Sequence, residues 1–130
     1  MFENIPLELI SNTVSFIVII AIIIRVIKYK KKVAVIDGLY ELQEKKQLSQ
    51  TDKEFISSNI LEYKAKFVKQ EAFNKLMYPG FILVTGIFVI FFDFAEAMIH
   101  INIVVVTYIY IYVKKIHYKN FITLLEGIKI

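Results

Sequence analysis

The fold depends on how residues 76–113 are interpreted, a stretch with the sequence LMYPGFILVTGIFVIFFDFAEAMIHINIVVVTYIYIYV. Asp93 and Glu96 are its only charged side chains. As a single α-helix, residues 81–113 would be roughly 50 Å long, whereas the hydrocarbon core of a bilayer is about 30 Å thick. The stretch is therefore too long for one membrane crossing. Its length alone does not decide between one long helix and two shorter ones.

The distribution of basic residues decides the number of crossings. The chain has sixteen lysine and arginine residues, of which twelve lie in 25–75 and four in 114–129. Because basic segments that flank membrane helices stay in the cytoplasm, both segments are expected on the same side of the membrane. A chain that leaves one side and returns to it crosses an even number of times. Residues 76–113 are therefore predicted to form a hairpin of two membrane helices.

A further apolar stretch precedes these segments. Leu9 to Ile27 contains nineteen residues with Arg25 as the only charge, close to the about 20 residues that a membrane-crossing helix needs. Pro6 suits the first turn of such a helix, where its missing N–H is no loss. No basic side chain precedes the stretch and no small-residue cleavage site follows it, so we expect it to stay in the membrane and not to be removed as a signal peptide.

The sequence thus predicts an all-α membrane protein, with three transmembrane helices and a cytoplasmic antiparallel helical hairpin between spans 1 and 2. The expected segments are an external N-terminal tail (1–8), transmembrane helix 1 (9–27), a cytoplasmic basic flank and helical hairpin (28–72), transmembrane helix 2 (73–92), transmembrane helix 3 (93–115) and a cytoplasmic C-terminal tail (116–130). Phe92–Asp93 is the predicted turn, because Asp93 and Glu96 have the spacing of a capping box. Pro79–Gly80 predicts a kink or a helix start.

Residues 28–72 have the pattern of two helices with one apolar face each. Apolar residues recur at helical spacing on both sides of a predicted turn at 47–50, namely Val35, Leu39 and Leu42 before it and Ile56, Ile60, Tyr63 and Phe67 after it. The first helix is expected to continue directly from span 1, and Thr51 with Glu54 forms the predicted capping box of the second. Thr51, Glu54 and Phe55 resemble the turn of short bacterial helical hairpins of the SHOCT type. The glycine of that turn is absent, and the resemblance implies nothing about function.

Four polar residues in or beside the predicted spans form a candidate intramembrane polar cluster: Asn12, Asp93, Glu96 and His100. Glu96 and His100 lie four residues apart and hence on one helix face. Ionisable groups inside a membrane often mark proton pathways, and histidine titrates near neutral pH. Helix capping and hydrogen bonds between helices explain the same residues without a pathway. We expect Asn12 to bond to Glu96 or His100, and Ser11 with Ser15 to form a helix-packing motif of small residues.

Two further groups are expected at the inner membrane surface. The basic flank of the first span consists of Arg25, Lys28, Lys30, Lys31 and Lys32. It is a topology signal that also attracts anionic lipid. Tyr108, Tyr110 and Tyr112 near the end of the third span are the predicted interfacial aromatic belt.

Nothing in the sequence indicates an enzyme, a metal site or a cofactor. The chain has no cysteine, and its two histidines, His100 and His117, lack metal-ligand spacing. No phosphate-binding loop, nucleophile elbow or His-Glu-x-x-His motif occurs. Nucleic acid is not expected as a partner, because the basic residues flank the predicted spans and form no recognition fold.

Three functions remain open for such a protein, which we expect as a multi-pass protein in the cell inner membrane with its C-terminus in the cytoplasm. The first is a non-enzymatic accessory or assembly subunit of a larger membrane complex, whose partners are the lipid bilayer and other membrane proteins or a second copy in a homo-oligomer. The second is a small oligomeric protein that conducts ions or protons through Glu96 and His100. The third is an immunity or lysis-related membrane protein.

Overall fold

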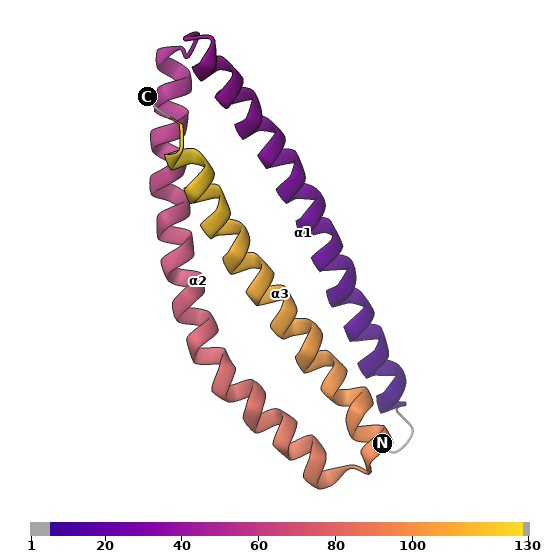
Figure 1. The fold of residues 1–130 in the computed structure, drawn as a ribbon. Coiled ribbons are helices and arrows are strands. Elements are labelled where there is room, and N and C mark those ends of the chain that lie inside the picture. The colour runs from indigo at the N-terminus through magenta and orange to yellow at the C-terminus, as the bar shows by residue number, and fades with distance from the viewer. Residues whose placement is uncertain (1–5, 129–130) are drawn as a thin grey trace. The chain divides into compact units, whose positions relative to one another are not determined.

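A computed structural model describes residues 6–128 of the 130-residue chain. Within these residues it contains three α-helices and no strand (Figure 1). The helices are α1 (Leu7–Glu44), α2 (Gln50–Phe91) and α3 (Phe94–Glu126). The predicted all-α class is confirmed.

Each of these helices contains an apolar stretch of membrane-spanning length. The most apolar stretches have mean hydropathies of 2.4 in α1, 1.6 in α2 and 1.7 in α3. At most 17% of any of these stretches is buried inside the protein, so most of their apolar surface faces outward, as it does in helices that contact lipid. In the part of the chain that the structure describes, three helices are thus long and apolar enough to cross a membrane, which is consistent with a multi-pass membrane protein.

Two helices extend beyond the limits that the sequence suggested. α2 runs without interruption from Gln50 through Pro79 to Phe91, so no helix starts at Pro79–Gly80. α3 continues past Lys115 to Glu126, so the helix extends into the tail expected at 116–130. The physical reason lies in His117, Phe121 and Leu125, which follow each other at four-residue spacing and are all buried. This apolar face keeps the last turns of α3 packed and helical.

The connection between α1 and α2 is built from two capping motifs. At the end of α1 the Gln47 N–H donates to the Leu42 carbonyl (2.8 Å) and the Lys46 N–H to the Gln43 carbonyl (3.0 Å). These two bonds form a Schellman motif, in which Lys46 adopts the left-handed conformation with a φ of 57°. The connection therefore begins earlier than the predicted turn at 47–50.

The cap of α2 is also placed differently from the prediction. The Asp52 N–H donates to Ser49 Oγ (3.0 Å), and the Ser49 N–H donates to Asp52 Oδ2 (3.0 Å). This reciprocal pair is a capping box with Ser49 as the N-cap residue. The predicted box of Thr51 and Glu54 has the same spacing but lies two residues too late, because Thr51 is already inside α2.

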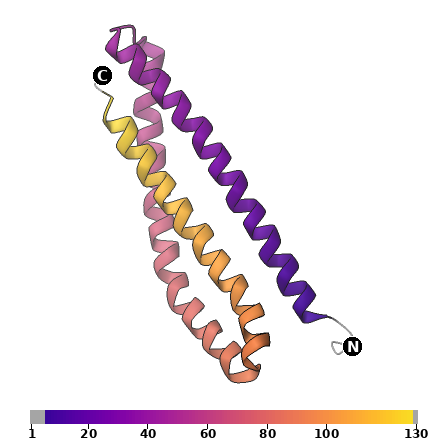
Figure 2. The same ribbon diagram turned by 45° about the vertical axis from the view of Figure 1, so that its right-hand side comes forward.

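The connection between α2 and α3 follows the prediction. α2 ends at Phe91 and α3 begins at Phe94 (Figure 2). Asp93 Oδ1 accepts a hydrogen bond of 2.8 Å from the Glu96 N–H. Asp93 is thus the N-cap of α3, and the predicted turn at Phe92–Asp93 is confirmed.

The chain divides into two compact units, each of which contains a segment of every helix. The apolar unit comprises the residues up to Ile24 together with Phe73–Val113, and the basic unit comprises Arg25–Ala72 together with the residues from Lys114 onward. Fifteen of the sixteen basic residues and eight of the twelve acidic residues belong to the basic unit, which gives it a net charge of +7.

The basic unit has a core to which all three helices contribute. The buried apolar residues of this core are Ile36, Leu39, Ile56, Tyr63, Phe121, Leu125 and Ile128. Ile56 and Leu125 are almost completely enclosed, with 0% and 1% of their surface exposed. Of the predicted apolar faces, Leu39, Ile56 and Tyr63 therefore lie in this core, whereas Val35 is 56% exposed. Burial on this scale is what allows the unit to keep its structure around many charged side chains.

Candidate functional site

A buried polar pair joins α1 to α3 in the apolar unit. Ser11 Oγ and His100 Nδ1 lie 2.5 Å apart, and both side chains are buried. The imidazole packs against two aromatic rings, with centroid distances of 4.6 Å to Phe92 and 5.5 Å to Phe88. The contact of His100 with Phe92 brings the turn before α3 against the first turns of that helix.

Two polar atoms near this pair lack hydrogen-bond partners. Within residues 6–128, the buried atoms Nε2 of His100 and Oγ of Ser15 have no partner. Ser15 lies one turn after Ser11 on the same buried face of α1. A buried polar atom without a partner is costly in an apolar environment and is often explained by a function. His100 is therefore the residue of the apolar unit that is best placed for a chemical role.

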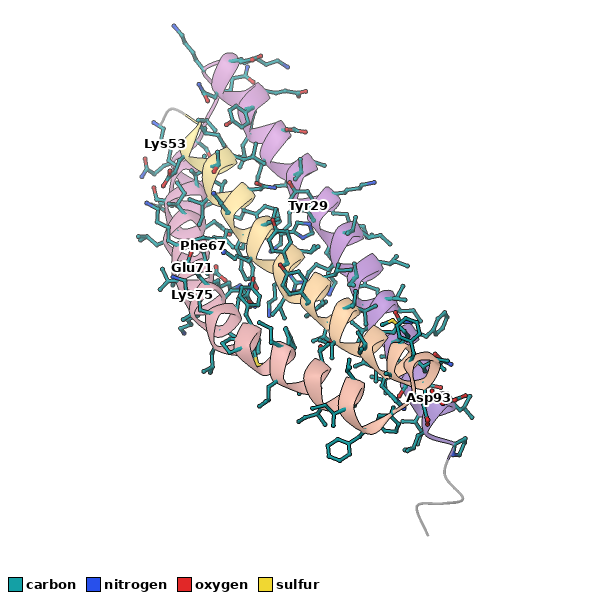
Figure 3. All side chains as sticks on the ribbon, turned by 60° about the horizontal axis from the view of Figure 1, so that its bottom comes forward. Tyr29, Lys53, Phe67, Glu71, Lys75 and Asp93 are labelled. Carbon is teal, nitrogen blue, oxygen red and sulfur yellow. The ribbon has the colours of Figure 1, made fainter. Side chains whose placement is uncertain are left out.

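The residues of the candidate intramembrane polar cluster do not all meet. Asp93 is exposed at the turn between α2 and α3, where it caps α3 (Figure 3). Glu96 is half-buried beside it, and only His100 is fully buried. Asn12 is exposed, and the bond that we expected from it to His100 is made by its neighbour Ser11. The periodicity of α1 explains this difference, because adjacent residues of a helix point about 100° apart.

A second buried polar residue, Asn74, was not expected from the sequence. Its side chain is only 1% exposed, and its Nδ2 donates a hydrogen bond of 3.1 Å to the carbonyl of Ile111. This bond links α2 to α3 within the apolar unit. Asn74 lies in a charged stretch of sequence, EAFNK, that gives no indication of burial.

The predicted aromatic belt is divided between faces of α3. The rings of Tyr108 and Tyr112 stack with their centroids 6.0 Å apart, and both side chains are more than 40% exposed. Tyr108 also contacts Tyr78 of α2, with a centroid distance of 5.4 Å. Tyr110 lies on another face and is half-buried. Tyr78, Tyr108 and Tyr112 thus form a tyrosine cluster between α2 and α3 in the apolar unit.

The basic flank is divided as well. Lys28, Lys30, Lys31 and Lys32 are exposed. Lys32 donates a hydrogen bond to the Tyr63 hydroxyl, and its ammonium lies over the rings of Tyr63 (4.8 Å) and Phe121 (5.5 Å). The guanidinium of Arg25 lies 5.9 Å from the ring centroid of Tyr118. Two of the five predicted lipid-facing cations therefore contact the aromatic part of the basic unit through cation–π interactions.

His117 is a buried histidine of the basic unit. Its imidazole stacks on the ring of Tyr29 with a centroid distance of 4.0 Å and an interplanar angle of 13°. Tyr29 lies on α1 and is directed toward α3 (Figure 3). Burial lowers the pKa of His117 below its ordinary value of 6.5, and the positive charge of Arg25 lowers it further. The sequence placed His117 only as an isolated histidine, since nothing in the sequence indicates that Tyr29 would cover it.

A cavity of about 210 Å³ lies between the three helices of the basic unit. It is lined by Lys32, Val35, Ile36, Phe55, Asn59, Tyr63, Phe121 and Leu125. The buried residues among these form its floor, whereas Val35 and Phe55 at its edge are 56% and 46% exposed. A mostly apolar cavity with one cation at its edge is suited to binding an apolar group that carries negative charge.

Among residues 6–128, no group of three or more histidine, cysteine, aspartate or glutamate side chains could hold a metal ion.

Comparison of the chain with protein-family models, with curated proteins and with solved structures finds no match. The geometry of the two units is therefore the basis on which a function has to be argued.

Proposed function

We propose that this protein is a three-span membrane protein that acts through contacts with other membrane proteins, as an accessory or assembly subunit of a larger complex and not as an enzyme. The apolar unit then lies in the bilayer, with the N-terminus outside. The basic unit, with the connection between α1 and α2 as a helical hairpin, lies in the cytoplasm. The charge distribution supports this orientation, because fifteen of the sixteen basic residues belong to one unit.

One observation carries the proposal of a protein partner. In the basic unit, α2 exposes an apolar stripe that consists of Leu61, Ala65, Val68 and Ala72. Leu61 and Val68 are 71% and 66% exposed. Their spacing of four, three and four residues keeps them on one helix face.

The charges around this stripe argue against its contact with the hydrocarbon core of the bilayer. Glu62, Lys64, Lys66, Lys69 and Glu71 lie among the stripe residues. A helix with so many charges does not lie in the hydrocarbon core, where each charge would be costly. Small and apolar residues at this spacing are instead suited to close packing against a helix of another protein. The stripe therefore supports a partner protein at the membrane surface.

The test is purification of the full chain in mild detergent, followed by mass spectrometry. We expect one partner protein at a fixed stoichiometry with the wild type, and its loss with Leu61→Glu and with Val68→Glu. Thr123→Glu is the control, since Thr123 is exposed on α3, a helix that contributes nothing to the stripe. Purification of the chain without a stoichiometric partner, or equal retention of the partner by all variants, would contradict the proposal.

A second candidate is a small oligomeric protein that conducts protons through Glu96 and His100. It is favoured by the buried Nε2 of His100, which has no hydrogen-bond partner within residues 6–128. A proton flux in liposomes that is lost with His100→Leu and with Glu96→Gln, but kept with Asn12→Leu, would support it. Liposomes that hold the wild type and leak no faster than empty ones would exclude it.

A further inference from the structure

The cavity of the basic unit has buried side chains at its floor and exposed apolar side chains at its edge. Ile36, Tyr63, Phe121 and Leu125 line it and are each at most 7% exposed. Val35 and Phe55 line it and are both exposed. Exposed apolar side chains around an apolar cavity are costly in water, and they are typical of places where a partner's side chain inserts. The cavity is therefore a candidate binding site.

The size of the cavity limits what it can hold. An apolar cavity of about 150 Å³ is large enough to bind benzene. The volume of about 210 Å³ found here therefore admits one phenylalanine or leucine side chain. The volume matches one such side chain, so the expected occupant is a single large apolar side chain.

The charge at the edge of the cavity indicates the surroundings of this side chain. Lys32 lines the cavity, and its ammonium forms no ion pair with any residue of 6–128. Glu62 is near enough for its carboxylate to interact with the charge of Lys32, but it forms an ion pair of 2.9 Å with Lys66. The unit as a whole carries a net charge of +7. A complementary occupant is therefore acidic.

We propose that this cavity seats one large apolar side chain from an acidic segment of a partner protein, with Lys32 facing a carboxylate beside that side chain. The inference rests on the proposed function, because it assigns the chemistry of the partner's contact. Asn59 at the edge of the cavity and Leu61 of the apolar stripe are two residues apart on α2 and hence point about 200° apart around the helix. The cavity and the stripe would therefore contact different parts of the partner.

Site-specific photo-cross-linking in cells that make the full chain tests this proposal. A photoreactive phenylalanine analogue replaces Phe55 in one variant and Val35 in another. Thr123 of α3, which is exposed and does not line the cavity, is the control position. We expect both cavity positions, but not the control, to cross-link to the same protein. Mass spectrometry should identify an acidic peptide with a large apolar residue at the site of attachment.

Charge variants then test the role of Lys32. Combined with the probe at Phe55, Lys32→Glu is expected to reduce the cross-link by about tenfold or more, since a like charge would face the carboxylate. Lys32→Met, which removes the charge but keeps an unbranched apolar side chain of similar length, should also reduce the cross-link. Lys31→Glu makes the same charge change at a neighbouring exposed position and should leave the yield within about twofold.

The outcomes separate this proposal from the proposed function. Cross-linking to lipid, to a second copy of the chain or to a basic peptide would overturn the assignment of the cavity. The same holds if the stoichiometric partner copurifies but neither cavity position cross-links to it. In these cases the subunit function would stand. Absence of any copurifying partner would overturn both proposals.

Discussion

Ser11 and His100 are 89 positions apart in the sequence, yet Ser11 Oγ lies 2.5 Å from His100 Nδ1. The contact ties α1 to α3 inside the apolar unit. Hydrogen bonds between polar side chains stabilise helix association where apolar side chains gain little by leaving lipid. This bond is therefore expected to hold the first span against the third.

Ser11→Ala and His100→Leu test this bond. Each change is expected to lower the free energy of unfolding by about 0.6–2 kcal/mol, and their effects should be non-additive by at least about 0.5 kcal/mol because they remove the same bond. The measurement is a double-mutant cycle from unfolding of the protein in detergent. Asn12→Leu is the control, since Asn12 is exposed and its effect should add to that of His100→Leu. Additive effects of the Ser11 and His100 changes would contradict the contact.

The candidate site could be predicted from sequence only in part. His100 and Asp93 stand out as polar residues in an apolar stretch, and the cap spacing identifies the role of Asp93. The choice of Ser11 over Asn12 depends on the rotation of α1 about its axis. That rotation is set by packing against other helices. The predicted packing motif of Ser11 and Ser15 indicates the packed face, because both serines are buried whereas Asn12 is exposed. The burial of Asn74 was missed because it also depends on packing between helices.

Lys46 holds a backbone conformation that favours glycine. With a φ of 57°, its backbone lies in the left-handed region, which costs a residue with a Cβ roughly 1–2 kcal/mol. Lys46→Gly is therefore expected to raise the free energy of unfolding by about 1 kcal/mol, measured as a higher midpoint in thermal or chemical unfolding. Lys45→Gly should instead leave stability unchanged or lower it. A destabilising Lys46→Gly would argue against this turn.

His117 should make the basic unit sensitive to mild acid. Its pKa in the folded protein is lower than the ordinary value of 6.5. As the pH falls, His117 therefore binds a proton in the unfolded chain at a pH where it is still neutral in the folded chain. The stability is thus complete above about pH 6.5 and falls as the pH decreases below that value. His117→Phe keeps a ring against Tyr29 but cannot titrate. Unfolding followed between about pH 7.5 and pH 5.5 should give a flatter profile for this variant. Equal slopes for both proteins would exclude His117 as the cause.

Gly127 leaves room for the hydroxyl of Tyr40. That hydroxyl donates a hydrogen bond of 2.6 Å to the Leu124 carbonyl. A Cβ at position 127 would collide with it. Gly127→Ala is therefore expected to cost about 1 kcal/mol by weakening the bond. In a Tyr40→Phe background the hydroxyl is gone and the cost should shrink. An undiminished cost in that background would show that the collision is not responsible.

The fold was more accessible to sequence reasoning than the packing. The turn at Phe92–Asp93 follows from local chemistry, because an aspartate caps a helix by bonding to a nearby N–H. The choice between the capping boxes at Ser49 and Thr51 does not, since both have the required spacing and types of residue. The extension of α3 through Phe121 and Leu125 depends on contacts with residues such as Tyr29 and Tyr63, which are distant in the sequence.

The central claim is that the apolar unit crosses the membrane three times and leaves the basic unit in the cytoplasm. The chain has no cysteine, so single cysteines can report the side of each connection. Gln47→Cys marks the connection between α1 and α2, and Phe94→Cys marks the start of α3, where the side chain is 82% exposed. The reagent is a maleimide that does not pass the membrane, added to intact and to permeabilised cells.

We expect Phe94→Cys to react in intact cells and Gln47→Cys to react only after permeabilisation. Reaction of Gln47→Cys in intact cells, or reaction of Phe94→Cys only after permeabilisation, would contradict the three-span topology.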